Sequence, residues 1–475
     1  MTAFVDRKKS KWTLEALKDT VQKVYWTDVI DRPKPSPSLN EEVTSDLTII
    51  GAGFTGLWAA LQAKEEFPNK KIIVLEANVV GFGASSRNGG FCYASLTHGL
   101  LNGINRWEDE MVLLQKLGKD NLKGIIETVE KYNIDADIEF TGTINIATAE
   151  WQVKELKKSV ALYEKYGENV TFLEKETIQQ EIKSPLNLAG IYLNDSIIMI
   201  NPAKLVLGLK KACKSLGVMF YENSRVHEIE DKKEQLIVKT SKGAVISLKV
   251  ISATNAWGRP VKGIRKHVVV IYDHVLMTQP LNEEELASIG WKGRQGLSDF
   301  ANQFHYYRLT SDNRILWGGW DANYYKKSAI RSDYENRETT FTLLSDHFFE
   351  AFPQLENKIK FTHRWAGPIG TTSQFSATFG KKYKGKLAWV AGYTGLGVGA
   401  SRFGARVALD LLDNVDNERT RLKMVRKKPM PFPPEPFRHF FIQYTKKKIA
   451  EADANDGKRG VWLKILDSLG LGFDS

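Results

Sequence analysis

The chain has 475 residues, 42% hydrophobic and 26% charged, a composition typical of globular proteins with two or three domains. Lys and Arg outnumber Asp and Glu by only 67 to 56, so we expect an evenly basic surface and no nucleic-acid partner. The only cysteines, Cys92 and Cys213, exclude a disulfide framework and a Cys-rich metal centre. We expect no metal, no transmembrane segment, no secretion signal and a cytoplasmic location.

A strand–helix–strand pattern follows an N-terminal lead-in. The lead-in, residues 1–45, has a helical pattern over 12–24 and then a proline-rich link that cannot continue a helix. An apolar, β-branched run over 46–50 predicts a buried parallel strand, the spacing over 55–66 predicts a helix, and the run over 71–76 predicts a second buried strand. Such a β–α–β unit of about 30 residues is typical of dinucleotide binding.

The rest of the chain alternates helical and strand-rich segments. Lys/Glu-rich stretches over 105–135 and 150–183 have helical spacing, whereas 268–319 is rich in strands and aromatic residues. A later buried strand leads through a glycine-rich turn into a helix over 401–412. The tail carries a basic amphipathic helix near 437–454, which we expect to pack through its aromatic side chains with its lysines in water. Docking of this helix to a membrane or a partner is the alternative.

A glycine-rich motif ends the first predicted strand. The run Gly51-Ala52-Gly53-Phe54-Thr55-Gly56 has the G-x-G-x-x-G spacing: Gly51 permits a tight turn, Gly53 lets the backbone approach a pyrophosphate, and Gly56 lets helix and strand pack closely. Unpaired N–H groups at the helix start favour an anion. Glu76 ends the next strand, where its carboxylate can accept hydrogen bonds from ribose hydroxyls. The combination predicts a dinucleotide site; a purely structural glycine turn is the alternative.

A second glycine-rich loop comes directly after Glu76. Small residues, one arginine and an Asn-Gly turn suit a loop that lies against phosphates and a planar ring, although a flexible surface loop is the alternative. The loop reads Gly81-Phe82-Gly83-Ala84-Ser85-Ser86-Arg87-Asn88-Gly89-Gly90-Phe91.

Together these segments resemble the D-amino-acid oxidase/glycine oxidase superfamily of FAD enzymes, nearest its γ-glutamylputrescine oxidoreductase branch. The resemblance rests on 51–56, Glu76, 83–90 and the late turn Gly392-Tyr393-Thr394-Gly395-Leu396-Gly397-Val398, and it extends from about Tyr25 to Leu412. It implies an α/β fold: a Rossmann-like, three-layer FAD-binding domain plus an α+β substrate domain with a mixed, largely antiparallel sheet. The predicted parts are 1–45, lead-in; 46–100, 201–258 and 360–426, FAD domain; 101–200 and 259–359, substrate domain; 427–475, basic tail.

The resemblance also implies which residues bind FAD. The glycines of the first motif would hold the pyrophosphate, Glu76 the adenosine ribose, and the turn after Gly392 the pyrimidine edge of the flavin. We expect non-covalent FAD; Cys92 and His98 are the candidates for covalent attachment. The implied cofactor residues are Gly51, Ala52, Gly53, Phe54, Thr55, Gly56, Glu76, Ala77, Gly83, Ala84, Ser85, Ser86, Arg87, Asn88, Gly89, Gly90, Val226, Ala253, Thr254, Trp257, Gly392, Gly395, Leu396, Gly397 and Val398.

The substrate side is predicted from strand alternation. Over 268–277, Tyr272 and His274 share one face, and in the following hairpin Tyr307 and Arg308 lie on opposite faces. In a sheet that roofs a flavin, aromatic side chains on one face can cage an amine and exclude water. We therefore predict Tyr272, His274, Tyr307 and Arg308 as pocket residues; a core of packed aromatic residues is the alternative.

Two departures from the superfamily affect the predicted reaction. The relatives that take α-amino acids clamp the carboxylate with an arginine, but the corresponding stretch, 365–370, has no arginine after Gly367, and Arg364 lies on the wrong side of Trp365. This favours amines. The sarcosine oxidase branch has a lysine near the flavin that promotes O2 reduction, and the matching positions, 314–317, have none. The electron acceptor is therefore open.

We predict oxidation of a C–N bond in a small-molecule amine, such as a polyamine conjugate or an amino acid derivative. Hydride transfer to flavin N5 would give an imine that water hydrolyses, with O2 or another acceptor taking the electrons. The alternatives are a flavin dehydrogenase that passes electrons to a quinone or carrier, and a non-catalytic flavin-binding sensor. An enzyme dependent on NAD alone is a weaker one. The oligomeric state stays open.

Overall fold

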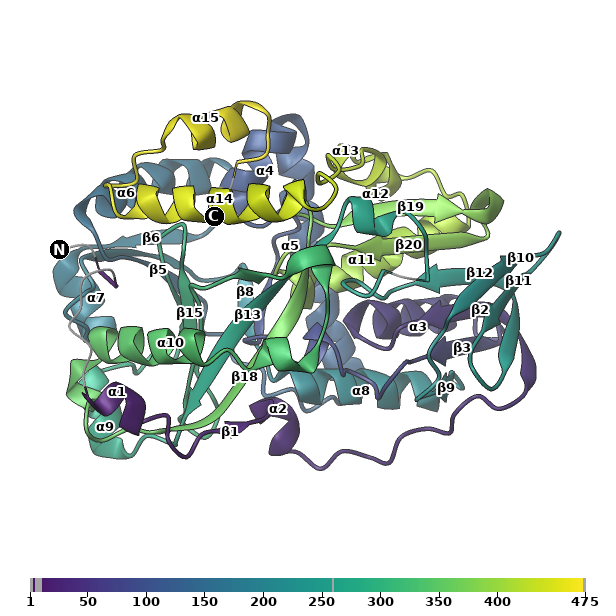
Figure 1. Ribbon diagram of the computed structural model, residues 1–475, viewed down its shortest axis with the longest axis horizontal. Coiled ribbons are helices and arrows are strands. Elements are labelled where there is room, and N and C mark those ends of the chain that lie inside the picture. Colours follow the sequence, from purple (N-terminus) through teal and green to yellow (C-terminus); the bar gives the residue numbers. More distant parts are fainter. Residues whose placement is uncertain (1–2, 5–10, 259, 473–475) are drawn as a thin grey trace.

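The computed structural model describes residues 3–4, 11–258 and 260–472, whose strands form two large sheets and one small one (Figure 1). The small sheet pairs β4 (Phe91–Tyr93) with β8 (Ile197–Met199). The first large sheet has eight strands, with the order β10-β11-β12-β2-β3-β9, and β20 and β19 continue from β12. Its strands are β2 (Glu42–Ile50), β3 (Ile72–Leu75), β9 (Met219–Tyr221), β10 (Glu228–Asp231), β11 (Leu236–Lys239), β12 (Ala244–Ser252), β19 (Thr378–Lys382) and β20 (Leu387–Ala391).

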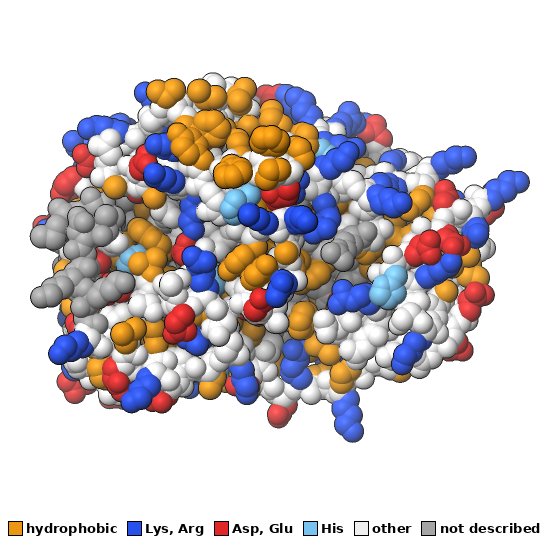
Figure 2. Space-filling view, in the orientation of Figure 1, with side chains coloured by type: hydrophobic (Ala, Val, Ile, Leu, Met, Phe, Trp, Pro, Cys, Tyr) orange, Lys and Arg blue, Asp and Glu red, His pale blue; other side chains and the backbone are white. Residues whose placement is uncertain are grey.

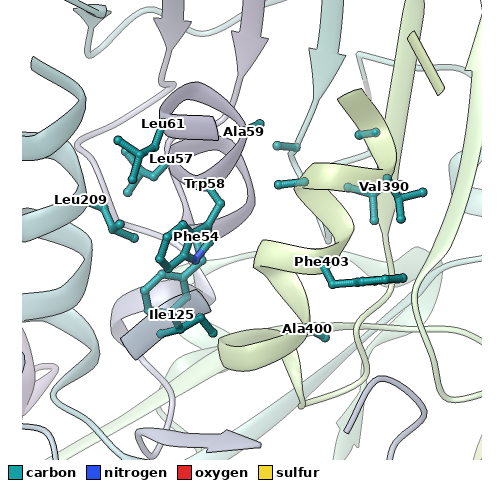
Figure 3. Close-up of a cluster of buried hydrophobic side chains, with 14 of the residues drawn as sticks. Phe54, Leu57, Trp58, Ala59, Leu61, Ile125, Leu209, Val390, Ala400 and Phe403 are labelled. Carbon is teal, nitrogen blue, oxygen red and sulfur yellow. The ribbon is translucent and has the colours of Figure 1, made fainter. Parts of the chain in front are cut away.

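Three helices pack together beside the eight-stranded sheet. They are α3 (Phe54–Glu66), α8 (Pro202–Ser215) and α11 (Gly397–Leu412), and α3 lies between the other two (Figure 3). Trp58 of α3 is fully buried in this cluster, to which Leu209 of α8 and Phe403 of α11 also belong. Each large apolar side chain buried here contributes about 1.5–3 kcal/mol to stability. This packing therefore stabilises the three helices against one another and beside the sheet.

The central strands of this sheet confirm the predicted β–α–β unit. β12, β2, β3 and β9 run parallel to one another, as does β20 beside β12. In β2 the last four residues are buried, and β3 is buried throughout, as apolar runs between two covered faces require. The carboxyl ends of β2 and β3 therefore lie side by side, and the glycine motif and Glu76 meet there.

The second large sheet has ten strands and is largely antiparallel, as predicted. Its order is β1-β18-β13-β16-β15-β14-β5-β7-β6, with β17 beside β13. α10 (Glu338–Ala351) packs on one face, where Phe341, Phe348 and Phe349 are fully buried. The strands are β1 (Val21–Gln22), β5 (Thr143–Ala147), β6 (Val170–Leu173), β7 (Ala189–Leu193), β13 (Val269–Thr278), β14 (Gly296–Asp299), β15 (His305–Leu309), β16 (Ile315–Gly319), β17 (Asn323–Tyr324) and β18 (Phe361–Thr371).

Two boundaries differ from those expected. The helix expected over 12–24 is α1 (Lys11–Glu15) alone, because Val21 and Gln22 pair instead with the edge of β18 and the Thr20 hydroxyl donates to the Phe361 carbonyl at 3.1 Å. β18, placed by prediction in the cofactor domain, lies in the ten-stranded sheet, where it pairs with β13 over its length.

The remaining helices surround the two sheets. No helix in 3–4, 11–258 or 260–472 is long and apolar enough to cross a membrane. The tail forms a pair of helices, α14 and α15, drawn in yellow in Figure 1. The α-helices not yet given are α2 (Tyr25–Asp28), α4 (Leu100–Trp107), α5 (Met111–Lys131), α6 (Glu150–Lys165), α7 (Lys175–Glu181), α9 (Glu283–Ile289), α12 (Glu418–Arg421), α13 (Lys423–Arg426), α14 (Phe437–Asp453) and α15 (Val461–Ser468).

Candidate active site

A cavity of about 800 Å³ is lined by residues of both large sheets, from Ile50 and Leu75 to Ile271 and Asp273. This is within the usual size range of cofactor and ligand pockets. Most residues predicted to bind the cofactor line it. They are Gly51, Gly53, Phe54, Thr55, Glu76, Ala77, Gly83, Ala84, Ser85, Arg87, Asn88, Gly89, Val226, Ala253, Thr254, Trp257, Gly395, Leu396, Gly397 and Val398.

Two helix N-termini face the cavity. α3 begins after Gly53 and α11 begins after Leu396, and neither of these N-cap residues supplies a side-chain hydrogen bond, although the Ser85 hydroxyl accepts one from the Phe54 N–H at 2.9 Å. Backbone N–H groups in the first turn of each helix therefore favour an anion or a polar ring edge. A Cβ atom on Gly53 would lie 2.8 Å from the Ser85 hydroxyl oxygen, so a larger residue there would displace this side chain. The site fits a pyrophosphate at α3 and the polar edge of a ring at α11.

Glu76 lies in the cavity wall beside the glycine turn. One carboxylate oxygen accepts a hydrogen bond from the Ala52 N–H at 2.8 Å, and the other accepts from the Asn78 N–H at 2.9 Å. Burial raises the pKa of this carboxyl, while the two backbone donors oppose that shift. Each oxygen keeps a lone pair, so the carboxylate can still accept hydrogen bonds from ribose hydroxyls, and its contact with the cofactor stays a prediction.

Hydrogen bonds shape the second glycine-rich loop. The Asn88 amide donates to the Ala84 and Ser85 carbonyls at 3.0 and 3.1 Å, and its oxygen accepts from the Gly90 N–H. The indole N–H groups of Trp26 and Trp365 donate to the Asn88 and Arg87 carbonyls at 2.9 and 2.8 Å. The loop is therefore fixed along the cavity.

Five predicted cofactor residues do not line the cavity but pack behind it: Ala52, Gly56, Ser86, Gly90 and Gly392. A Cβ atom on Gly56 would lie 1.9 Å from the Gly51 carbonyl oxygen, and one on Gly90 would lie 2.2 Å from the Ile200 carbonyl oxygen. The Gly392 N–H donates to the Asn255 side chain at 2.8 Å. The glycines among these residues allow close packing around the turns that do line the cavity.

The residues predicted for the substrate pocket lie elsewhere. Tyr272 and His274 face the side of β13 covered by α10 and its preceding segment, where the His274 ring lies 5.3 Å from the Phe341 ring and the Tyr272 hydroxyl accepts from the Arg331 N–H. Tyr307 packs against Trp291. The alternation along these strands was right, but the face chosen for these three residues was wrong, because period-two alternation does not say which face a helix covers.

Arg308 lies on the cavity side of β15 but not in the cavity wall. Its guanidinium donates to the Ile200 carbonyl at 2.8 Å and lies 3.4 Å from a carboxylate oxygen of Glu139. Burial lowers its pKa to about 10. With these partners it holds the loop around Gly90, and the prediction that it contacts substrate is replaced by this positioning role.

An acid and a phenol that sequence analysis missed do line the cavity. Asp273 of β13 accepts a short hydrogen bond from the Tyr306 hydroxyl of β15. Burial raises the pKa of Asp273 to about 6, although the Tyr306 hydroxyl opposes the shift. A Cβ atom on Gly89 would lie 2.8 Å from the Tyr306 ring, so the pair adjoins the cofactor loop. The signal in the sequence was an acidic residue inside an otherwise apolar strand, which rarely occurs without a partner or a role.

The two candidates for covalent attachment differ in position. His98 lines the cavity, and burial lowers the pKa of its ring to about 4. Cys92 is fully buried in β4 outside the cavity wall, and burial raises the pKa of its thiol to about 12. A thiol held in its neutral form is a poor nucleophile.

Comparison with known proteins gives the family. Residues 46–411 match the family described as "FAD dependent oxidoreductase". The chain belongs to this family. It is 31% identical over 396 residues to a probable oxidoreductase OrdL of Haemophilus influenzae, covering 82% of this chain and 87% of that protein. It is 30% identical over 396 residues to γ-glutamylputrescine oxidoreductase of Escherichia coli, and this match covers 82% of this chain and 88% of that protein.

Solved structures of this fold include two oxidases that act on amino acids or related amines by name. Glycine oxidase from Geobacillus kaustophilus superposes with a TM-score of 0.66 at 18% identity, covering 79% of this chain and 96% of that one. Iminodiacetate oxidase from Chelativorans sp. BNC1 also superposes with a TM-score of 0.66, at 16% identity. The match covers 81% of this chain and 98% of that one. The chain therefore shares the fold of these two oxidases. Its tail beyond residue 411 lies outside the family match.

Proposed function

We propose that this FAD-dependent oxidoreductase oxidises the C–N bond of a small amine that carries no free α-carboxylate at the reacting end. The observation that carries the proposal is the Asp273–Tyr306 pair in the cavity wall beside Gly89. A carboxylate with a pKa near 6 is largely ionised at neutral pH, so it can hold a substrate ammonium group and take a proton from it.

The arginines on this side of the cavity support amines over α-amino acids. Pro368 follows Gly367 where the superfamily's carboxylate-binding arginine is expected. Arg87 forms a short ion pair with Glu335 and also donates to the Ala366 carbonyl. Arg364 pairs with Glu338 at 2.8 Å and lies outside the cavity wall. Arg87 and Arg364 are therefore engaged by other partners and do not offer a substrate carboxylate a free bidentate fork.

The reaction needs a neutral amine before the carbon–hydrogen bond breaks. Asp273 would accept the ammonium proton, and the Tyr306 hydroxyl, which donates to Asp273, stabilises the ionised carboxylate that does so. The oxidising chemistry would be supplied by FAD, as acceptor of the hydride lost from the carbon next to nitrogen. The resulting imine is hydrolysed by water to a carbonyl compound and the released amine or ammonia. Gly51, Gly53, Glu76 and the start of α11 would hold the cofactor while this happens.

Anaerobic titration of the purified flavoprotein with amines tests the proposal. γ-Glutamylputrescine, simple alkylamines and D-alanine are compared, and loss of the visible flavin absorbance reports reduction. We expect reduction by amines and little by D-alanine. Reduction by D-alanine and by none of the amines would overturn the proposal. The electron acceptor is open because β16 carries no lysine of the kind that promotes O2 reduction. Oxygen uptake during turnover in air identifies the acceptor, because a dehydrogenase would consume almost no O2.

A further inference from the structure

The tail beyond the family match forms part of the cavity wall. The inner sides of α14 and α15 and the segment after them contribute Phe441, Ile442, Ile449, Leu463, Leu466 and Leu471. Phe304 and Trp320 of the ten-stranded sheet region line the same cavity. We expected the tail helix to pack on the body through its aromatic residues. Its packing instead leaves an apolar wall around open space.

Hydrogen bonds and ion pairs fix the tail over this space. The Asp453 carboxylate, at the end of α14, accepts from the N–H groups of Asn302 and Gln303 at 3.1 and 2.9 Å. Near the start of α14, Glu435 accepts from the Lys327 N–H at 2.8 Å. α15 is held to α14 by the Trp462 indole, which donates to the Thr445 hydroxyl at 3.0 Å. Both ends of α14 are therefore anchored to the body of the protein, and α15 is anchored to α14.

The charged side chains that reach the cavity from the tail already have partners. Lys446 forms a short ion pair with Asp321, and Arg459 pairs with Asp467 at 2.5 Å. Burial alone would raise the pKa of Asp321, but the Lys446 charge lowers it to about 2. Binding a substrate carboxylate here would require one of these pairs to break.

We propose that the tail helices and Trp320 form a binding subsite for the apolar part of the amine, an alkyl chain or ring extending away from the Asp273–Tyr306 pair. This inference rests on the proposed function for the reacting end of the amine and adds the chemistry of its other end. It separates this chain from an enzyme that selects a charged far end, because the wall offers apolar surface and its cations are paired. An apolar group that enters the subsite gains transfer free energy with each methylene it buries.

The outer side of the same helices offers a matched control. Phe437, Phe440 and Tyr444 of α14 are 67%, 68% and 47% exposed, and apolar side chains gather over this part of the surface in Figure 2. Phe440 and Ile442 are two residues apart on one helix, yet only Ile442 lines the cavity. A polar substitution at Phe440 thus changes the same helix without touching the proposed subsite.

The test measures affinity for butylamine, hexylamine and octylamine by calorimetry, using FAD-loaded protein that has been chemically reduced so that no turnover occurs. We expect the dissociation constant to fall about fourfold for each added methylene. The fall in the dissociation constant for each methylene should drop below about twofold in Ile442→Asn and in a second variant, Ile449→Asn. In the control, Phe440→Asn, it should stay at about fourfold. A factor near one in the wild type, or the same factor in all four proteins, would overturn the subsite.

The outcomes separate the two proposals. If the amines bind with the expected chain-length dependence but none reduces the oxidised flavin, the proposed reaction fails and the subsite stands. If short and long amines reduce the flavin equally well and bind with equal affinity, the reaction stands and the subsite fails. Circular dichroism of each variant identifies one that has not folded, and the remaining Ile variant then decides the question.

Discussion

Replacing Gly56 by alanine tests the anion-binding turn where the structure leaves the least room. The added Cβ atom would lie 1.9 Å from the Gly51 carbonyl oxygen and 3.3 Å from a methyl group of Ile49. The first contact is with backbone, which cannot rotate away as a side chain does. The start of α3 must therefore move by about 1 Å or more relative to β2. The general motif accepts alanine at this position, so the prediction comes from this structure and not from the pattern.

We expect two effects of Gly56→Ala. Overpacking of this kind costs about 1–3 kcal/mol, so the free energy of unfolding of the apoprotein should fall by that amount. The displaced N–H groups at the start of α3 would also lose good hydrogen-bond geometry to the pyrophosphate, which weakens FAD binding by about tenfold or more. Urea unfolding followed by tryptophan fluorescence measures the first effect, and quenching of FAD fluorescence on titration with apoprotein measures the second.

Gly460→Ala is the control for this experiment. No atom lies within 4 Å of a Cβ atom built there, and its φ of −70° suits any residue. Its effect on stability should stay within about 0.5 kcal/mol, with unchanged FAD affinity. If Gly56→Ala behaves like this control in both assays, close helix–strand packing does not shape the turn, and the reasoning is refuted.

Three further predictions concern the cavity. The kcat/KM for amines should fall as the pH drops through about 6, because protonation of Asp273 removes its charge, and Asp273→Asn should abolish this acidic limb in the pH profile of flavin reduction. Tyr306→Phe removes a donor that stabilises the ionised carboxylate, so it should move the limb upward by about one pH unit, while Tyr272→Phe, on the other face, should leave its midpoint unchanged. Glu76→Gln loses a charged acceptor and should weaken FAD binding about 10- to 100-fold in the same fluorescence titration; unaltered affinity would show that the carboxylate does not contact the cofactor.

The cofactor side of the site could be predicted from sequence because it is specified locally. Buried parallel strands leave long apolar runs, and a backbone that must approach another backbone leaves glycine at fixed spacing. All three glycines lie in a single strand–turn–helix segment. Gly51 and Gly56 meet backbone atoms of Ala253 and Gly51, whereas Gly53 meets the Ser85 hydroxyl. Most residues of that prediction consequently lie along the cavity. The lead-in was less predictable, since its helix competes with pairing to β18, a strand more than 300 residues away.

The substrate side could not be predicted in the same way, since side chains from distant segments specify it. Alternation along β13 correctly places Tyr272 and Asp273 on opposite faces, but only the packing of α10 decides which of these faces lines the cavity. The tail poses the same problem more acutely: α14 has apolar residues on both sides, with Phe440 outward and Ile442 inward, so its amphipathic pattern does not identify the buried side. Short motifs thus specify the backbone that binds the cofactor, whereas the proposed substrate side depends on contacts between distant segments, such as that of Asn302 with Asp453. Short motifs alone therefore predict the family of this protein better than they predict its substrate.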